Sequence, residues 1–260
     1  MDFKNLVVSE EDRIGIITIN RLERYNALDL QTEKEIGAAF DVLDHEGIQG
    51  VIITGAGDKA FSAGADIFPY LEMDLIKSIP YMERLRSVLW KIENFPKPVV
   101  AAINGYCLGG GFELALSCHF RIASSDTVFG FPEIDVGVFP GNGGSQRLAR
   151  LIGRGRALWF VTTGERIKAE EALALGIVHK IEPPDQVLIR SKDFLINTLF
   201  KKPPIALWAA ITSVNKGAEM DLDSACRFDV HLTSLCMGTE DFREGIKAFV
   251  AKRKPVFKGN

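Results

Sequence analysis

The sequence predicts an α/β fold followed by a helical C-terminal part, and two observations support this prediction. Between about residues 14 and 123, short runs of β-branched and other apolar residues alternate with longer segments whose apolar residues have helical spacing. Strands that are apolar almost throughout are typical of parallel sheets covered by helices. After about Gly143, helical patterns dominate. We therefore expect an α/β core over residues 1–195 and a C-terminal helical oligomerisation region over residues 196–260.

The expected elements of the core follow this rhythm from the start of the chain. Two strands, rich in β-branched residues, flank a turn at residues 10–13. Asp29 is a suitable N-cap for a helix whose apolar face carries Ile36, Phe40 and Leu43. The remaining elements are predicted as strands at 51–54, 99–103 and 120–123 and helices at 75–93 and from about 109–111. This order indicates strand–helix–strand units rather than an all-α or all-β domain.

The C-terminal part is predicted to be a series of helices with a break at Pro203-Pro204. The predicted helices span 145–151, 156–162, 169–175, 184–200, 205–216, 221–237 and 241–252. No low-complexity linker separates them from the core. The last helices must therefore pack on a core of their own or on another subunit.

Composition excludes several classes of protein. Of the 260 residues, 47% are hydrophobic and 25% are charged, which provides for a folded core and argues against a disordered chain. The net charge is −3 with both signs interspersed, so no broad basic surface is available for nucleic acid or a membrane. The longest apolar stretch, residues 98–118, contains Asn104, Glu113 and three consecutive glycines, which argues against a membrane span.

The cysteines and the N-terminal residues indicate the compartment. No C-x-x-C pair or common zinc spacing occurs, so thiols of a reducing compartment are expected at Cys107, Cys118, Cys226 and Cys236. The first residues resemble neither a signal peptide nor a transit sequence. We expect a cytoplasmic protein.

Three segments carry the candidate chemistry, at residues 61–67, 102–115 and 129–144. The second has glycines at 109–111 between a buried strand and a helical run. Glycine lets a ligand approach the backbone, and the first turn of a helix has unpaired N–H donors. That arrangement suits an oxyanion such as a thioester enolate, with a second donor from the loop at 63–65.

A glycine run by itself is weak evidence, because a tight turn or close helix packing also explains it. Nucleotide-binding alternatives fit poorly. No G-K-[ST] follows, as a P-loop requires, and the spacing G-x-G-x-x-G of dinucleotide-binding loops is absent there.

Two glutamates are candidates for acid/base chemistry. Glu113 lies in the first turn of an apolar helix, where it could equally complement the helix dipole. Glu133 follows Pro132 among aromatic and apolar residues, although it could also be a surface loop charge. Burial would raise the pKa of Glu133 towards neutrality, and two nearby carboxylates would titrate apart. One could then serve as acid and the other as base.

Taken together, the segments resemble the crotonase family, also called the enoyl-CoA hydratase/isomerase family. The resemblance covers nearly the whole chain, through motifs at 26–28, 61–66, 109–113, 129–133, 140–148, 163–178 and 244–253. It implies a spiral of ββα units with C-terminal helices, assembled as a trimer or a hexamer. The thioester oxygen would be bound by the backbone N–H groups of Ala65 and Gly110. No metal or redox cofactor is implied, since coenzyme A is part of the substrate.

The resemblance also implies contacts to the coenzyme A part of the substrate. The Ala63 backbone would face the adenine, Arg24 would reach the phosphates, and Phe249 and Lys252 of a neighbouring subunit would help to hold the ligand. Other substrate-binding positions carried over from the family are Asp66, Ile67, Gly109, Phe131 and Gly141.

Within the family, hydratases carry both glutamates, whereas isomerases usually keep the one that matches Glu133. The implied reaction is therefore hydration of a 2-enoyl-CoA, in which Glu113 activates water for attack on C3 and Glu133 protonates C2. The reverse dehydration is equally implied. Double-bond isomerisation, decarboxylation, ring chemistry and retro-aldol cleavage stay open, as does a non-catalytic RNA-binding or scaffold role.

Several positions depart from the family pattern and leave the acyl group open. They are Leu22, Phe112, Phe131, Thr233 and the segment at 68–70. Aromatic bulk at these positions would favour a short, planar or cyclic acyl group, but ordinary packing explains aromatic residues equally well.

Overall fold

The computed structural model describes residues 2–260, which fall into two compact units. The first unit comprises the chain up to Glu93 together with Val99–Ser191, and the second comprises Asn94–Pro98 together with Lys192–Asn260. The division lies close to the predicted boundary after residue 195. The assignment of residues 196–260 to oligomerisation stays a prediction.

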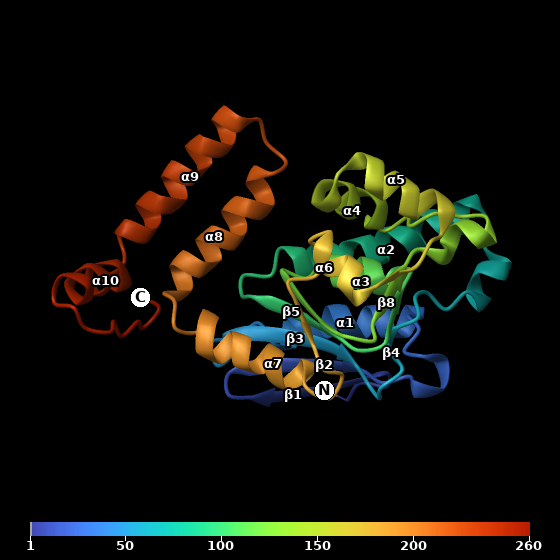
Figure 1. Ribbon diagram of the computed structural model, residues 1–260, viewed down its shortest axis with the longest axis horizontal. Coiled ribbons are helices and arrows are strands. Elements are labelled where there is room, and N and C mark those ends of the chain that lie inside the picture. Colours follow the sequence, from blue (N-terminus) through green and yellow to red (C-terminus); the bar gives the residue numbers. More distant parts are fainter. Residues whose placement is uncertain (1) are drawn as a thin grey trace. The chain divides into compact units, whose positions relative to one another are not determined.

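A six-stranded sheet forms the base of the first unit (Figure 1). Its first two strands form an antiparallel hairpin, and the other strands are parallel. In spatial order the strands are β1 (Leu6–Glu11), β2 (Ile14–Ile19), β3 (Gly50–Gly55), β5 (Val99–Ile103), β7 (Phe120–Ser124) and β10 (Lys180–Glu182). Strands β3 and β5 are buried along their whole length, as their apolar runs predicted. The hairpin turn is shorter than predicted because Asp12 and Arg13 take positive φ values of 50° and 66°, which lets β1 continue to Glu11.

A second sheet has four short strands, of which the first three run parallel and the last is antiparallel. They are β4 (Ala60–Ser62), β6 (Tyr106–Leu108), β8 (Val128–Gly130) and β9 (Ile167–Lys168). Each of the pairs β3–β4, β5–β6 and β7–β8 places its first strand in the large sheet and its second in the small one. A helix follows each pair, so the predicted ββα repeat is confirmed.

The helices of the first unit begin close to their predicted positions. They are α1 (Leu30–Val42), α2 (Leu75–Glu93), α3 (Gly110–Ser117), α4 (Gly144–Ile152), α5 (Arg154–Thr163), α6 (Ala169–Ala174) and α7 (Val187–Phe194), with 3₁₀ turns η1 (Leu22–Arg24), η2 (Phe68–Glu72) and η3 (Pro132–Val136). Asp29 caps α1 as predicted, because its Oδ1 accepts the Thr32 N–H at 2.7 Å. Helix α3 packs against α2, α4, β4 and β6, and all of its residues are buried. It is the central helix of this unit.

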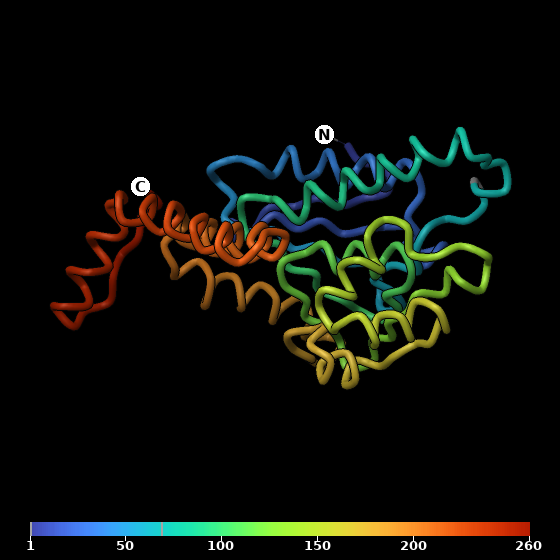
Figure 2. The backbone as a smooth tube through the Cα atoms, turned by 90° about the horizontal axis from the view of Figure 1, so that it is seen from above, coloured from blue at the N-terminus to red at the C-terminus, as the bar shows by residue number. Residues whose placement is uncertain are grey.

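The second unit is helical. It contains the π-helical turn η4 (Leu195–Leu199), α8 (Pro204–Gly217), α9 (Leu222–Met237) and α10 (Glu240–Val250). The one helix predicted over residues 184–200 is therefore α7 followed by a wider turn. Helices α8 and α9 pack side by side as an antiparallel pair (Figures 1 and 2).

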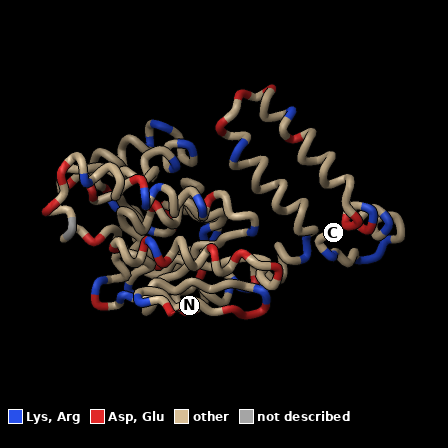
Figure 3. Tube along the Cα trace, turned by 180° about the vertical axis from the view of Figure 1, so that it is seen from behind, with Lys and Arg blue, Asp and Glu red and all other residues tan. Residues whose placement is uncertain are grey.

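Charge and hydropathy match the composition. Lysine and arginine alternate with aspartate and glutamate along the trace of the first unit, without a continuous basic stripe (Figure 3). Within residues 2–260, no helix combines the length and the apolar character needed to cross a bilayer.

Candidate active site

The functional residues follow the carboxyl ends of three neighbouring strands. Strands β4, β6 and β8 lie side by side and run parallel. The loop at 63–65 follows β4, Gly109 and Gly110 follow β6, and Glu133 follows β8. Parallel strands bring their carboxyl ends to one edge of a sheet, so segments far apart in the sequence meet there.

Glycine is required where β6 passes into α3. Gly109 has φ 51° and ψ −126°, a conformation that side chains disfavour. A Cβ at this position would also lie 3.0 Å from Glu133 Oε1. The next residue, Gly110, is the first of α3, so its N–H has no acceptor within the helix. The turn thus exposes a backbone donor beside a carboxylate.

A second backbone donor lies beside the first. The Leu28 N–H donates to Gly64 O, and the Asp66 N–H donates to Leu28 O, both at 2.8 Å. This pairing leaves the Ala65 N–H without an acceptor in the described part of the chain. A Cβ built on Gly110 would lie 3.4 Å from Ala65 N. The two N–H groups can therefore contact one oxyanion.

Glu113 is buried and held by backbone donors. Its Oε1 accepts the N–H groups of Asn142 at 2.8 Å and Gly144 at 2.9 Å. Burial raises the pKa of Glu113, and these two hydrogen bonds act against that rise by favouring the ionised form. Gly144 must lack a side chain, because a Cβ there would lie 2.8 Å from both Glu113 Cγ and Phe131 Cζ.

Glu133 lies in η3 and has a different environment. Its Oε2 is buried and has no hydrogen-bond partner among the described residues. Burial raises the pKa of Glu133 to about 7, and the charge of Glu113 adds to the rise. Glu113 thus receives two hydrogen bonds that favour its charge, whereas Glu133 favours its protonated form near neutral pH. Such a difference suits one base and one acid.

Both glutamates and both donor loops line one cavity of about 680 Å³. The rest of its wall comes from η2, α2 and the segment at 136–142, including Tyr70, Met73, Tyr81, Met82, Leu85, Val138 and Phe139. The volume and the largely apolar wall suit a small organic ligand with a few polar anchors.

Comparison with known proteins identifies the family. The family model described as enoyl-CoA hydratase/isomerase matches residues 9–260. The chain belongs to the enoyl-CoA hydratase/isomerase family. This family member is 38% identical over 255 residues to a short-chain-enoyl-CoA hydratase of Clostridium acetobutylicum, covering 98% of this chain and 97% of the relative. It is also 38% identical over 258 residues to a crotonyl-CoA hydratase of Syntrophomonas wolfei, covering 99% of both.

A solved structure gives the same result. The chain superposes on subunit I of an enoyl-CoA hydratase from Geobacillus kaustophilus with a TM-score of 0.95, at 38% identity and with 100% of both chains covered. The crotonase fold predicted from the resemblance is therefore confirmed.

The predicted site residues of this enoyl-CoA hydratase/isomerase family member differ in their position relative to the cavity. Besides both glutamates, the residues lining the cavity are Ala63, Ala65, Ile67, Gly109, Gly110 and Gly141. Phe131 is fully buried behind the cavity and stacks on Phe112, with ring centroids 4.7 Å apart. Arg24 is exposed, with its guanidinium 5.5 Å from the centroid of the Phe68 ring. Phe249 and Lys252 belong to the second unit. The substrate contacts assigned to these four residues stay predictions.

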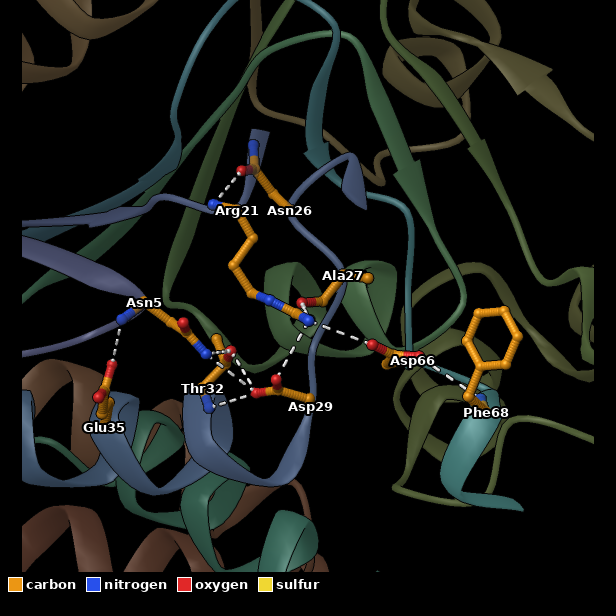
Figure 4. Close-up of polar contacts among 9 residues, drawn as sticks. All are labelled: Asn5, Arg21, Asn26, Ala27, Asp29, Thr32, Glu35, Asp66 and Phe68. Carbon is orange, nitrogen blue, oxygen red and sulfur yellow. Dashed lines mark hydrogen bonds and ion pairs between the residues drawn. The ribbon is translucent and has the colours of Figure 1, made fainter. Parts of the chain in front are cut away.

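Asp66 takes part in a polar network instead of lining the cavity (Figure 4). The Arg21 guanidinium pairs with Asp29 at 3.1 Å and with Asp66 at 3.2 Å, and it donates to Ala27 O at 2.6 Å. Arg21 therefore links the start of α1 to the residue that follows Ala65.

Sequence reasoning missed several residues of the site in this family member. The glycine-rich motif at 141–144 was noticed, but the motif does not reveal that the Asn142 and Gly144 N–H groups bind Glu113. Tyr81 and Met82 gave no signal beyond the apolar face of a helix. Arg21 lies just before the family motif at 26–28, and one of its two carboxylate partners, Asp66, is distant in sequence.

Proposed function

We propose that this protein adds water across the C2=C3 double bond of a 2-enoyl-CoA, or catalyses the reverse dehydration of a 3-hydroxyacyl-CoA. One observation carries the proposal: Glu113 and Glu133 line the same cavity as the N–H donors of Ala65 and Gly110. Relatives named as enoyl-CoA hydratases support the same reaction.

The thioester would be activated by the two backbone donors. Its carbonyl oxygen would accept the N–H groups of Ala65 and Gly110 and gain negative charge as C3 is attacked. Donors fixed in place before the reaction stabilise this charge without reorganisation, and the loss of one such donor typically costs about 3 kcal/mol of transition-state stabilisation.

Glu113 would act as the base. The N–H groups of Asn142 and Gly144 hold its Oε1, which favours the ionised carboxylate. That carboxylate would remove a proton from water while the water oxygen forms a bond to C3. The π electrons of the double bond would move towards C2 and the thioester oxygen.

Glu133 would act as the acid. Its raised pKa of about 7 keeps much of it protonated near neutral pH, so it can deliver a proton to C2. The product would be a 3-hydroxyacyl-CoA, with Glu113 protonated and Glu133 ionised. Proton exchange with solvent would return both groups to their starting states.

Double-bond isomerisation is the second candidate, because the matching family model covers both hydratases and isomerases. An isomerase needs one group to move a proton between carbons, and Glu133 could do so without Glu113. Decarboxylation, ring chemistry and retro-aldol cleavage remain weaker alternatives. An RNA-binding role lacks support because basic and acidic residues are interspersed (Figure 3).

A panel of thioesters with Glu113→Gln and Glu133→Gln variants tests the function. The panel contains crotonyl-CoA and longer, branched, cyclic and dienoyl analogues. The reaction is monitored by the loss of conjugated absorbance and by the mass gain of one water. We expect hydration of at least one substrate and a loss of at least about 100-fold in kcat for each variant. Glu83→Gln on the exposed face of α2 is the matched control. Isomerised product without added water, persisting in Glu113→Gln, would instead establish the second candidate.

We also infer a homotrimer or homohexamer, a cytoplasmic location and no need for a metal or redox cofactor. Exposed apolar side chains on the C-terminal helices support assembly, among them Val214, Leu222, Val230 and Phe249. The four free thiols fit a reducing compartment. Acid/base chemistry by two carboxylates requires no metal, so activity should survive dialysis against a chelator.

A further inference from the structure

A second group of polar side chains, two of which line the cavity, has no role in the proposed reaction. It consists of Glu33 on α1, Tyr81 on α2 and Tyr70 on η2. Glu33 is fully buried, and neither of its carboxylate oxygens has a hydrogen-bond partner among the described residues. The hydroxyl of Tyr81 is likewise buried and unpartnered within residues 2–260. Unpaired buried polar groups destabilise a fold, so their presence calls for a ligand or a function.

The three side chains form a path from the interior to the cavity. Tyr70 and Tyr81 both line the cavity, and their rings meet edge to face at 5.6 Å and 89°. The Tyr81 hydroxyl lies near both the Glu33 carboxyl and the Tyr70 hydroxyl, although it forms a hydrogen bond with neither. Tyr70 is half-buried and completes the path at the cavity wall.

Glu33 can serve as either donor or acceptor. Burial raises its pKa to about 7, with the Arg84 guanidinium opposing the rise and the Asp29 carboxylate adding to it. A protonated Glu33 can donate towards Tyr81, and an ionised one can accept from it. The hydroxyls of Tyr81 and Tyr70 can rotate accordingly, so the path can offer a donor or an acceptor to the cavity.

The charges around Tyr70 select against an anion. Burial raises the pKa of Tyr70 to about 12, with the carboxyls of Glu33, Glu113 and Glu133 adding to the rise. An ionised Glu113 would repel a negatively charged ligand group at this wall, as would Glu33 or Glu133 whenever it is ionised. A neutral group that both donates and accepts hydrogen bonds fits best, and a hydroxyl is the simplest such group.

We propose that Tyr70, Tyr81 and Glu33 form a polar subsite that binds a neutral hydroxyl group on the acyl chain of the substrate. This inference rests on the proposed hydratase function and defines its substrate class. The rest of the acyl region, with Met73, Met82, Leu85 and Val138, would contact the carbon chain. The preferred substrate would then be a hydroxylated 2-enoyl-CoA, rather than an unsubstituted or a carboxylated one.

The test compares six-carbon substrates of equal length. They are trans-2-hexenoyl-CoA, its analogues with a hydroxyl at C4, C5 or C6, and 2,3-dehydroadipyl-CoA, which carries a terminal carboxylate. We expect at least one hydroxylated substrate to exceed hexenoyl-CoA in kcat/KM by about 3- to 10-fold, the range that one neutral hydrogen bond provides. The carboxylated substrate should be the poorest of the set.

Variants of the two tyrosines then test whether they cause the preference for a hydroxylated substrate. Tyr70→Phe and Tyr81→Phe each remove one oxygen atom, and each should lower the ratio of kcat/KM between the hydroxylated substrate and hexenoyl-CoA by about 3- to 10-fold. Tyr106→Phe is the matched control, since Tyr106 is exposed on β6 and does not line the cavity. Its ratio should equal that of the wild type. If Tyr81→Phe fails to fold, Tyr70→Phe at the cavity wall carries the same test.

The outcomes separate this inference from the proposed function. Hydration of hexenoyl-CoA without any preference for a hydroxylated analogue overturns the subsite and leaves the hydratase function in place. So does a preference that both phenylalanine variants retain, or a preference for the carboxylated substrate. Absence of hydration with every thioester overturns the hydratase function itself.

Discussion

At the scale of single residues, the two glutamates differ in what surrounds them. Glu113 Oε1 accepts two backbone N–H groups, whereas Glu133 Oε2 is buried without a partner. Burial raises the pKa of both carboxyls, but the two hydrogen bonds oppose this rise at Glu113. The proposed roles of base and acid rest on this difference in local hydrogen bonding.

This difference predicts the pH dependence of the reaction. Hydration needs Glu133 with its proton, and the pKa of Glu133 is raised to about 7, so kcat/KM for hydration should fall as pH rises through that region. Dehydration needs Glu133 ionised and should show the opposite trend. Initial rates in both directions between pH 5 and 9 test this. A hydration rate that stays constant to pH 9 would contradict the assignment of Glu133 as the acid.

Gly144→Ala is predicted to displace Glu113. The added Cβ would lie 2.8 Å from Glu113 Cγ and from Phe131 Cζ, so the Glu113 carboxylate must shift. Small displacements of reacting groups cost about 100-fold, and we expect a loss of that order in kcat. Gly155→Ala is the control, because a Cβ there meets nothing within 4 Å. Normal kcat in Gly144→Ala would mean that the position of Glu113 does not limit the reaction.

At the scale of elements, the loop that carries the Ala65 N–H depends on Arg21. Its guanidinium joins Asp29 at the start of α1 to Asp66, next to Ala65 (Figure 4). Arg21 is largely buried, with 12% of its side chain exposed. We interpret Arg21 as a positioning residue, because it holds the loop without contacting the cavity.

Substitution of Arg21 should therefore affect kcat more than KM. Arg21→Ala frees Asp66 and should lower kcat by at least about 10-fold, since the Ala65 N–H acts mainly on the charge that develops in the transition state. Arg21→Lys should lose less activity than Arg21→Ala, because lysine keeps the positive charge but lacks the planar guanidinium. Arg86→Ala, which removes an exposed pair with Glu83, is the control. An effect confined to thermal stability would show that Arg21 has a purely structural role.

Some elements could be predicted from the sequence and others could not. Strand Val99–Ile103 and helix Leu75–Glu93 match their predicted bounds, because the prolines at 96 and 98 separate them and a turn follows the strand. Strands β4, β6 and β8 have three residues each, too few to show periodicity. Glu33 lies on the buried face of α1, although an acidic residue in a helix ordinarily indicates the exposed face.

Some residues of the candidate site could likewise be predicted from the sequence, and others could not. The glutamates and the donor loops were found because motifs mark them in the sequence. The N–H groups that hold Glu113 and the ion pair of Arg21 with Asp66 depend on contacts between residues 29 to 45 positions apart. Such contacts follow from the tertiary fold and leave no local pattern.

At the scale of the whole molecule, the C-terminal helices carry several large apolar side chains that are mostly exposed. Val214 on α8 is 71% exposed, and Phe249 on α10 is 83% exposed. Self-association is the usual way to bury such residues. It would also bring Phe249 and Lys252 of one subunit to the ligand of another, as the family resemblance implies.

Light scattering should therefore give three or six times the chain mass. A double variant, Val214→Asp with Val230→Asp, places charges on α8 and α9 and should lower the measured mass and raise KM for the thioester together. A wild-type protein that remains monomeric at micromolar concentration with full activity would contradict the inferred assembly and the shared binding site.

Each of the three short strands β4, β6 and β8 leads into a different part of the candidate site. Under the proposed function, the loops after β4 and β6 supply the thioester donors, and the segment after β8 supplies Glu133. Exchange of the segment after β8 alone would then leave the oxyanion donors in place and alter the proton chemistry. A new reaction on an activated thioester could therefore arise from a change in one loop.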